Sequence, residues 1–231
     1  MTRSSAAFFD LDKTLISRSS TLAFTRPFYR DGLISRKAMI RGALAQAVFR
    51  RAGADHEWME RIRIQASQLC RGWPAEQVRE IVRKNLDEII VPHVYAEARS
   101  LVSGHHAAGR DVIVVSAAGH EVVDPIAALL GAHTVIATQM VIAGGRYTGE
   151  VAFYAYGEAK AAKIRELAAE RGYRLADSFA YSDSITDLPM LEAVGYPTAV
   201  NPDRSLRRVA AAREWPVLSF PEPPRGRPGR R

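Results

Sequence analysis

The sequence predicts an α/β protein in which a doubly wound parallel sheet carries a helical bundle inserted after its first strand. Residues 6–9 form an uninterrupted apolar run, which is typical of a strand buried on both faces of a parallel sheet. From His93 onward, strand-like and helix-like segments alternate, and this alternation implies right-handed crossovers between parallel strands. Between these regions, residues 20–89 have helical patterns only. We therefore expect a sheet domain with a helical insertion.

The strands of the predicted sheet are short apolar segments. They lie at residues 6–9, 112–115, 134–137, 179–181 and 198–200. Within residues 141–152, the pair Gly144-Gly145 is a hairpin signal between two further short strands. Because helical segments separate most of the strands, the sheet is expected to be mainly parallel.

The helices are predicted from apolar residues at helical spacing and from start and stop signals. In the sheet domain we expect them at 95–106, 121–130, 158–170, 187–194 and 206–213. In the insertion we expect them at 20–29, 35–51, 55–69 and 74–89, with Pro92 ending the last one. The predicted division is a core domain of residues 1–17 and 92–220, a helical cap of residues 18–91 and a disordered basic tail of residues 221–231.

Length and composition fit a globular protein with a sizeable core. The chain has 231 residues, of which 47% are hydrophobic and 25% are charged. The single cysteine, Cys70, excludes an internal disulfide and favours a reducing compartment, so the cytoplasm is the expected location. No signal peptide or transmembrane segment is expected. The net charge of +7 suits an anionic ligand or surface, but part of this charge lies in the tail, so it gives no firm indication of nucleic acid. The oligomeric state stays open.

Polar side chains follow three of the predicted strands. Asp10 and Asp12 follow the first strand, Ser116 follows the second, and Asp183 follows the fourth, with Asp187 four residues further on. Parallel strands bring their carboxyl ends to one edge of a sheet, so these groups should meet in space. Several carboxylates cannot all stay ionised there without cations, and an all-oxygen ligand set favours Mg²⁺ over Zn²⁺.

Each of these signals has an ordinary structural explanation when it stands alone. An Asp pair after a strand is often a turn or a helix cap, and an isolated Ser116 is more often a cap than a ligand. Lys160 could send an ammonium toward the site, but alone it is usually a solvated helix residue, and Lys163 is a rival for the role. The histidines without a metal-binding spacing are assigned to surfaces, namely His105, His106, His120 and His133.

Taken in order, the motifs resemble those of the haloacid dehalogenase (HAD) superfamily of phosphohydrolases. The four motifs are Asp10-Leu11-Asp12-Lys13-Thr14, Val115-Ser116, Lys160 and Asp183-Ser184-Ile185-Thr186-Asp187. The resemblance covers about residues 6–213 and is closest to the phosphoserine-phosphatase-like subfamily IB, as in Asp187-Leu188-Pro189-Met190-Leu191. It implies a Rossmann-like sheet, with the inserted helices as a cap in the family's first position.

The resemblance also implies catalytic and metal-binding roles. Asp10 would be the nucleophile that forms an aspartyl phosphate, and Asp12 would protonate the leaving alcohol and then deprotonate a water. Thr14, the hydrogen-bond partner of Asp12 in this pattern, indicates a phosphatase rather than a dehalogenase. Mg²⁺ would be held by the Asp10 carboxylate, the Asp12 backbone carbonyl and Asp183, with Asp187 acting behind these ligands.

The phosphate-binding groups implied by the resemblance are Thr14, Ser116, Ala117 and Lys160. Two positions depart from the family pattern. Ala117-Ala118 replaces the glycines that phosphoserine phosphatases commonly place after the serine, and Ser182 stands where a glycine commonly precedes Asp183.

The expected activity is Mg²⁺-dependent hydrolysis of a small phosphorylated metabolite other than phosphoserine. Phosphoserine phosphatases have a glutamate nine residues beyond the nucleophile, where it meets the substrate's ammonium, and the corresponding residue here is Ser19. Glu57 or Glu60 of the cap could supply a carboxylate from another direction. The alternative is a catalytically weak regulatory or binding protein of the same fold, which docks an anionic partner through the basic residues 26–51 or the tail.

Overall fold

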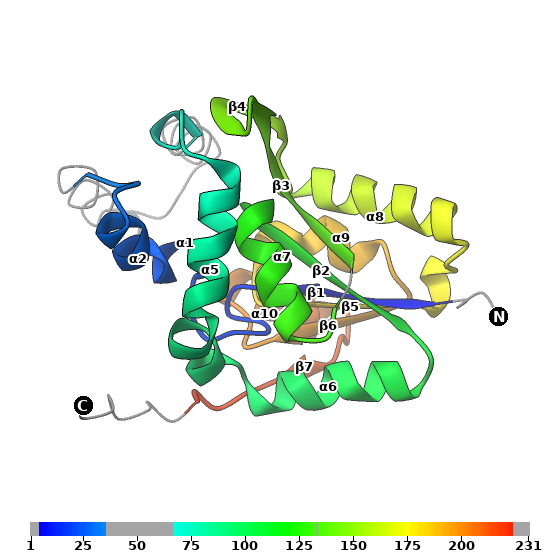
Figure 1. Cartoon of the computed structure of the whole chain (residues 1–231). Helices are drawn as coiled ribbons and strands as arrows, with labels where there is room; N and C mark the ends of the chain where they lie inside the picture. The colour runs from blue at the N-terminus through cyan, green and yellow to red at the C-terminus, as the bar shows by residue number, and fades with distance from the viewer. Residues whose placement is uncertain (1–4, 36–66, 133, 224–231) are drawn as a thin grey trace.

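A computed structural model describes residues 5–35, 67–132 and 134–223, which form a seven-stranded sheet flanked by helices (Figure 1). The strands are β1 (Ala6–Asp10), β2 (Asp111–Gly119), β3 (Thr134–Ala143), β4 (Arg146–Phe153), β5 (Phe179–Ser182), β6 (Tyr196–Val200) and β7 (Val217–Leu218). Their order in the sheet is β4-β3-β2-β1-β5-β6-β7, and every neighbouring pair is parallel except β3 and β4. The prediction of an α/β fold with a mainly parallel sheet is confirmed.

Helices cover both faces of the sheet. The α-helices are α1 (Ser20–Ala23), α2 (Thr25–Arg30), α5 (Ala75–Ile89), α6 (Ala96–Ala107), α7 (His120–Leu129), α8 (Glu158–Arg171), α9 (Leu188–Glu192) and α10 (Arg204–Ala212). Three short 3₁₀-helices are η1 (Val91–His93), η2 (Leu175–Asp177) and η3 (Ile185–Asp187). One hydrophobic cluster joins the sheet to α1, α2, α5, α6 and α7, and a second joins it to α8, α9 and α10.

Strand β1 lies at the centre of the sheet and contributes to both clusters. Ala7 and Phe9 pack into the first cluster, whereas Ala6 and Phe8 pack into the second. Phe8 and Phe9 are at most 1% exposed, and burying an aromatic side chain of this size stabilises a fold by about 1.5–3 kcal/mol. The strand that carries Asp10 is therefore fixed from both sides.

Several element boundaries differ from the predicted ones. The predicted helix at 20–29 is divided into α1 and α2 at Phe24, so that Pro27 falls in the first turn of α2, where a missing N–H is tolerated. Strand β2 continues past Val115 to Gly119, with a register shift after Ser116. The two-residue β7 was not predicted, because so short a segment has no readable period.

Some sequence predictions fall on residues outside the described part of the chain. These are most of the predicted helices 35–51 and 55–69, the candidate cap carboxylates Glu57 and Glu60, and residues 224–231 of the tail.

The predicted hairpin is present between β3 and β4. Gly144 and Gly145 have φ angles of +55° and +74°, a conformation that glycine adopts without steric cost. The hairpin also supports the start of α5, because the Ala75 N–H donates to the Gly145 carbonyl at 3.0 Å and the Gly72 N–H donates to the Tyr147 carbonyl at 2.8 Å.

The two predicted junctions between core and cap lie side by side. The Ser17 N–H donates to the His93 carbonyl at 2.8 Å, and the Tyr95 N–H donates to the Leu15 carbonyl at 3.1 Å. An insertion that leaves and re-enters a domain requires neighbouring junctions of this kind. The division into core and cap remains a prediction.

His105 is buried, so its assignment to the surface is wrong. Its side chain lies between α6 and β5, with Nε2 2.8 Å from the Tyr181 hydroxyl and Nδ1 accepting from Arg110 at 2.7 Å. Burial, and then the nearby Arg110, lower the pKa of His105 to about 4, so the ring is neutral at pH 7. His106 is exposed as expected, His120 is half-buried, and His133 lies outside the described residues.

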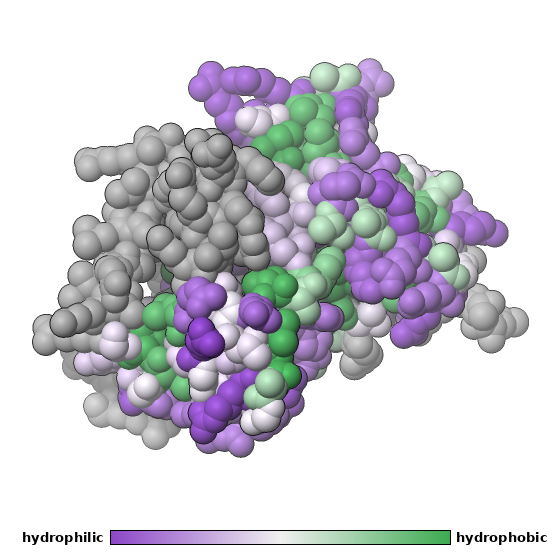
Figure 2. All heavy atoms as spheres, turned by 90° about the horizontal axis from the view of Figure 1, so that it is seen from above, coloured by the Kyte–Doolittle hydropathy of each residue, from purple (hydrophilic) through white to green (hydrophobic). Residues whose placement is uncertain are grey.

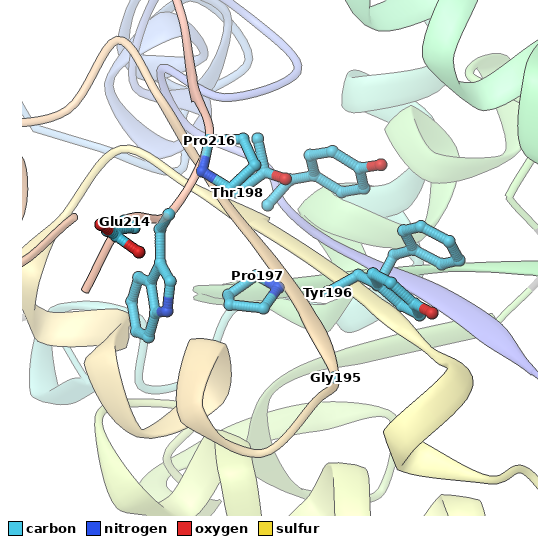
Figure 3. Close-up of a pocket in the computed structure, with 9 residues that line it drawn as sticks. Gly195, Tyr196, Pro197, Thr198, Glu214 and Pro216 are labelled. Atoms are coloured by element: carbon cyan, nitrogen blue, oxygen red, sulfur yellow. The ribbon is translucent and has the colours of Figure 1, made fainter. Parts of the chain in front are cut away.

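Polar residues cover most of the described surface seen in Figure 2, with smaller hydrophobic areas between them. Within the described ranges, no helix is both long and apolar enough to cross a membrane. A hollow of about 360 Å³ has walls that include Phe179, Tyr196 and Trp215. Figure 3 shows this hollow from close by, with Tyr196, Thr198 and Glu214 among the residues labelled. Phe179 and Tyr196 begin β5 and β6, so this hollow lies toward the amino ends of the strands, away from Asp10.

Candidate active site

Asp10 ends β1 at the point where the strand order of the sheet reverses. Strands β2 and β3 continue on one side of β1, and β5, β6 and β7 continue on the other. Asp10 pairs with Val115 of β2, so Ser116 follows at the same edge of the sheet. On the other side of β1, Phe9 pairs with Tyr181 of β5. Ligands of open α/β sheets bind at this carboxyl-edge switch point.

Lys160 is the buried cation of this edge. It lies in the first turn of α8, where its side chain is 3% exposed. Its Nζ is 2.8 Å from Asp10 Oδ1 and 2.7 Å from Asp187 Oδ1. Burial alone lowers the pKa of Lys160, but the two carboxylates outweigh burial and raise the pKa above its ordinary value. The ammonium is therefore charged and is shared between Asp10 and Asp187.

Lys163, the rival candidate, does not face the same edge. Its Nζ pairs with Glu166 at 2.6 Å, three residues further along α8, and its side chain is 40% exposed. The structure thus brings Lys160, and not Lys163, to Asp10.

The carboxylates at this edge form an anionic site. Burial raises the pKa of Asp10 well above its ordinary value, nearby Asp187 and Asp183 raise it further, and Lys160 opposes them. Burial likewise raises the pKa of Asp183 to about 7, although the exposed Lys13, with its Nζ 3.9 Å away, lowers it. Buried carboxylates that resist ionisation need a cation to hold them as anions. Carboxylate oxygens are the donors that Mg²⁺ prefers, so the chemistry of Asp10 and Asp183 suits that ion.

Asp12 lies in a turn that leaves the sheet. Lys13 has a φ of +64°, and the N–H groups of Leu15 and Ile16 both donate to the Leu11 carbonyl. The turn brings the first residue of α1 back to the site, where the Ser20 N–H donates to Asp12 Oδ1 at 2.9 Å. Burial raises the pKa of Asp12, and hydrogen bonds from Ser20 and Ser19 oppose this shift. A raised pKa increases the fraction of Asp12 side chains that carry a proton, as a general acid requires.

Thr14 does not hydrogen-bond to Asp12, contrary to the sequence-based expectation. The turn after Asp12 gives that carboxylate the N–H of Ser20 instead. Thr14 is 1% exposed, and its Oγ1 has no hydrogen-bond partner among the described residues. An unsatisfied buried hydroxyl costs about 1–3 kcal/mol, so this atom fits a ligand that accepts or donates a hydrogen bond.

Ser116 and Ala117 lie beside β1, at the start of the irregular end of β2. Ser116 is 2% exposed, and its Oγ accepts the Ala118 N–H at 3.2 Å. The Ala117 carbonyl accepts the Thr138 hydroxyl at 2.8 Å, which fixes the Ala117–Ala118 peptide. Both residues lie on the strand next to the one that carries Asp10.

Asp203 is a site-supporting residue that sequence reasoning missed. Its N–H donates to the Asp183 carbonyl at 2.7 Å, and its Oδ2 accepts the Ile185 N–H at 2.9 Å. Its Oδ1 caps α10 by accepting the N–H groups of Ser205 and Leu206. An aspartate directly before a helix is an N-cap signal, which could have located Asp203 but not its second contact.

These features together define a class of protein: a doubly wound α/β protein with two carboxylates after its first strand, and a buried lysine and a further carboxylate at the same edge. The sequence model of the haloacid dehalogenase-like hydrolase family matches residues 7–192. The chain therefore belongs to this family.

Three relatives resemble the chain over most of its length. A probable phosphatase of Mycobacterium tuberculosis is 57% identical, over 94% of this chain and 76% of the relative. The inhibition of morphological differentiation protein of Streptomyces azureus is 59% identical, over 95% and 80%. The histidinol-phosphatase of Neisseria meningitidis is 32% identical, over 93% and 98%. The relatives named phosphatase support phosphoric monoester hydrolysis as the class of reaction.

Solved structures share the fold. A Bordetella pertussis protein of unknown function superimposes with a TM-score of 0.82 at 31% identity, covering 94% of this chain and 99% of the other. A phosphoserine phosphatase, solved as an analogue of its phospho-aspartyl intermediate, superimposes with a TM-score of 0.66 at 18% identity, covering 95% of both chains. The second likeness supports the fold alone.

Proposed function

We propose that the protein is a Mg²⁺-dependent phosphatase that hydrolyses a small phosphomonoester through an aspartyl phosphate on Asp10. The observation that carries this proposal is the contact between the buried Lys160 ammonium and Asp10 Oδ1, at 2.8 Å, at the switch point of the sheet. A carboxylate held there beside a fixed cation can attack a phosphoryl group without charge repulsion preventing the approach.

The reaction divides into two steps. In the first, an Asp10 oxygen forms a bond to phosphorus while the ester P–O bond breaks, and Asp12 gives its proton to the departing alcohol oxygen. In the second, Asp12 takes a proton from water, the water oxygen bonds to phosphorus, and inorganic phosphate leaves as the Asp10 carboxylate is restored. The raised pKa of Asp12 suits a group that must begin this cycle protonated.

The phosphoryl oxygens are proposed to contact Lys160, Ser116, the Ala117 N–H and Thr14. The Thr14 hydroxyl, which has no hydrogen-bond partner among the described residues, supports its inclusion. Asp10, Asp183 and the Asp12 carbonyl would hold Mg²⁺, and the bound ion would neutralise phosphoryl charge and orient the group. Asp187 would act by holding Lys160 in place.

A panel of phosphomonoesters tests this proposal. Phosphate release is measured with Mg²⁺, with EDTA, and with Ca²⁺ in place of Mg²⁺. We expect turnover with Mg²⁺, none with EDTA and little with Ca²⁺, whose larger and looser coordination shell misplaces the phosphoryl group. No turnover of any phosphomonoester with Mg²⁺, or full turnover after complete metal removal, would contradict the proposal.

Asp12→Asn should reduce kcat by about 10²–10⁴-fold, the range expected when a general acid and base is lost. Asparagine retains an oxygen for the Ser20 N–H, so the turn should be preserved. The loss should be smaller for aryl phosphates, whose leaving groups need no proton. The measurement is kcat for matched alkyl and aryl phosphates, and equal losses for both would argue against this role.

Phosphoserine should be a poor substrate. Ser19, the half-buried residue before α1, has a neutral side chain at the position where phosphoserine phosphatases have a carboxylate. The charged side chains of residues 13–19 are the cations Lys13 and Arg18. Losing one charged hydrogen bond to the substrate ammonium costs about 1.5–3 kcal/mol, or roughly tenfold to a hundredfold in specificity.

Matched substrate pairs measure this effect. The kcat/KM for L-phosphoserine is compared with that for 3-phosphoglycerate, which has a hydroxyl in place of the ammonium. L-Histidinol phosphate, which has an ammonium but no carboxylate, is included because one relative is named histidinol-phosphatase. We expect 3-phosphoglycerate to equal or exceed phosphoserine. A clear preference for phosphoserine that disappears on mutation of Glu57 or Glu60 would contradict the prediction.

A regulatory role is the second candidate, favoured by the name of the Streptomyces azureus relative. Such a protein would bind its partner whether or not Asp10 can be phosphorylated. The two candidates separate when Asp10→Asn is tested for both phosphatase activity and in vivo function.

A cytoplasmic location remains part of the proposal and rests on the single cysteine.

A further inference from the structure

Ser182 is a buried hydroxyl next to the site that the proposed reaction does not use. It is the last residue of β5 and is 0% exposed. Its Oγ donates to Asp187 Oδ2 at 2.7 Å and accepts the Ser184 N–H at 3.2 Å. A glycine at this position could form neither side-chain contact.

The Ser182 hydroxyl begins a line of contacts that ends at Asp10. The other oxygen of Asp187, Oδ1, is 2.7 Å from Lys160 Nζ, and the same Nζ is 2.8 Å from Asp10 Oδ1. Asp187 is 2% exposed, so solvent cannot replace a lost partner cheaply. With both oxygens engaged, the carboxylate cannot turn about its last torsion without breaking one contact.

We propose that Ser182 is a positioning residue that orients Asp187 and thereby holds the Lys160 ammonium against Asp10. This inference rests on the proposed phosphatase function of the site. Lys160 can stabilise charge on the transferring phosphoryl group only if it is already in place, because reorganisation during the reaction costs rate. The Ser182 hydroxyl hydrogen-bonds to Asp187 and not to Asp10 or Lys160, so its influence on Lys160 passes through Asp187.

The first test compares Ser182→Ala with a matched control, Ser178→Ala. Ser178 is also 0% exposed, and its Oγ also makes two hydrogen bonds: it accepts from the Ala6 N–H and donates to the Arg174 carbonyl. It lies directly before the amino end of β5, whereas Ser182 lies at the carboxyl end. Both variants should lose some thermal stability. Only Ser182→Ala should lower kcat, by about tenfold, the loss expected for one hydrogen bond to a charged group. Equal kcat values for the two variants would overturn the inference.

A double-mutant cycle with Asp187→Ala, which removes the acceptor of the Ser182 hydroxyl, tests whether the effect passes through Asp187. If Ser182 acts only through that carboxylate, Ser182→Ala should change kcat less than about twofold in the Asp187→Ala background. Losses that multiply would show that Ser182 acts independently, which contradicts the inference. Ser182→Thr, which keeps the hydroxyl, should recover kcat relative to Ser182→Ala, and Ser182→Gly replaces Ser182→Ala if that variant does not fold.

A binding measurement separates failure of this inference from failure of the proposed function. Calorimetry gives the Kd for inorganic phosphate in the wild type and in each variant, and we expect weaker binding for Ser182→Ala than for Ser178→Ala. If the wild type hydrolyses no phosphomonoester but this difference and its coupling to Asp187 persist, the phosphatase proposal fails and the positioning role stands. If the wild type is active and Ser182→Ala matches Ser178→Ala in both kcat and Kd, the positioning role alone fails.

Discussion

Asp10→Asn is expected to lose turnover of every phosphomonoester, by on the order of 10⁴-fold or more, because an amide cannot serve as the attacking group. Asparagine has nearly the size of aspartate and retains an oxygen that can accept from Lys160 Nζ, so the variant should fold. Mg²⁺ should also bind more weakly, because an amide oxygen is a poorer ligand than a carboxylate.

Asp177→Asn is the matched control for this variant. Asp177 lies in η2, before the amino end of β5, and pairs with Arg174 at the surface. Its replacement should leave kcat unchanged. Both variants are assayed for phosphate release under saturating Mg²⁺, and thermal melting checks that each is folded. Substantial turnover by Asp10→Asn in a contaminant-free preparation would rule out Asp10 as the nucleophile.

Lys160→Ala should reduce kcat/KM by about 10²–10³-fold, the loss typical of removing a fixed charge that stabilises the transition state. The nearby Lys163→Ala should stay within about twofold of wild type, because exposed ion pairs such as Lys163–Glu166 contribute little. The same helix thus provides a target and a control three residues apart.

Removing Lys160 also leaves Asp10 and Asp187 buried without their cation, and breaking a buried pair in this way costs about 3–5 kcal/mol of stability. Melting temperatures must therefore accompany the kinetics, and Lys160→Met, which removes the charge but keeps a long side chain, serves as the variant if Lys160→Ala does not fold. A larger kinetic loss for Lys163→Ala than for Lys160→Ala would mean that the wrong lysine has been assigned.

The parts of the fold that the sequence predicted well are those set by local patterns. The apolar run before Asp10 can be read directly as a buried strand, and Gly144-Gly145 can be read as a hairpin, because each depends on a few adjacent residues. Strand β7 has only two residues, and its place is decided by pairing with β6, so no local pattern could predict it.

The candidate site shows the same division. The aspartates at the strand ends follow from the rule that parallel strands deliver their carboxyl ends to one edge. The shared Lys160 contact with Asp10 and Asp187 depends on where α8 and η3 pack, and sequence alone could not choose between Lys160 and Lys163 by geometry. The contacts of Asp203 and the burial of His105 likewise depend on tertiary packing.

The central claim is that a phosphoryl group is transferred to Asp10 during turnover. The most direct measurement mixes enzyme, Mg²⁺ and an aryl phosphate labelled in its phosphoryl group, quenches in acid after milliseconds, and identifies the labelled peptide by mass spectrometry. The account predicts acid-stable, base-labile label on Asp10, more of it in Asp12→Asn, whose second step is slow, and none in Asp10→Asn. Label on another residue would contradict the account. So would turnover by the wild type without label at any quench time, if Asp12→Asn also shows no label.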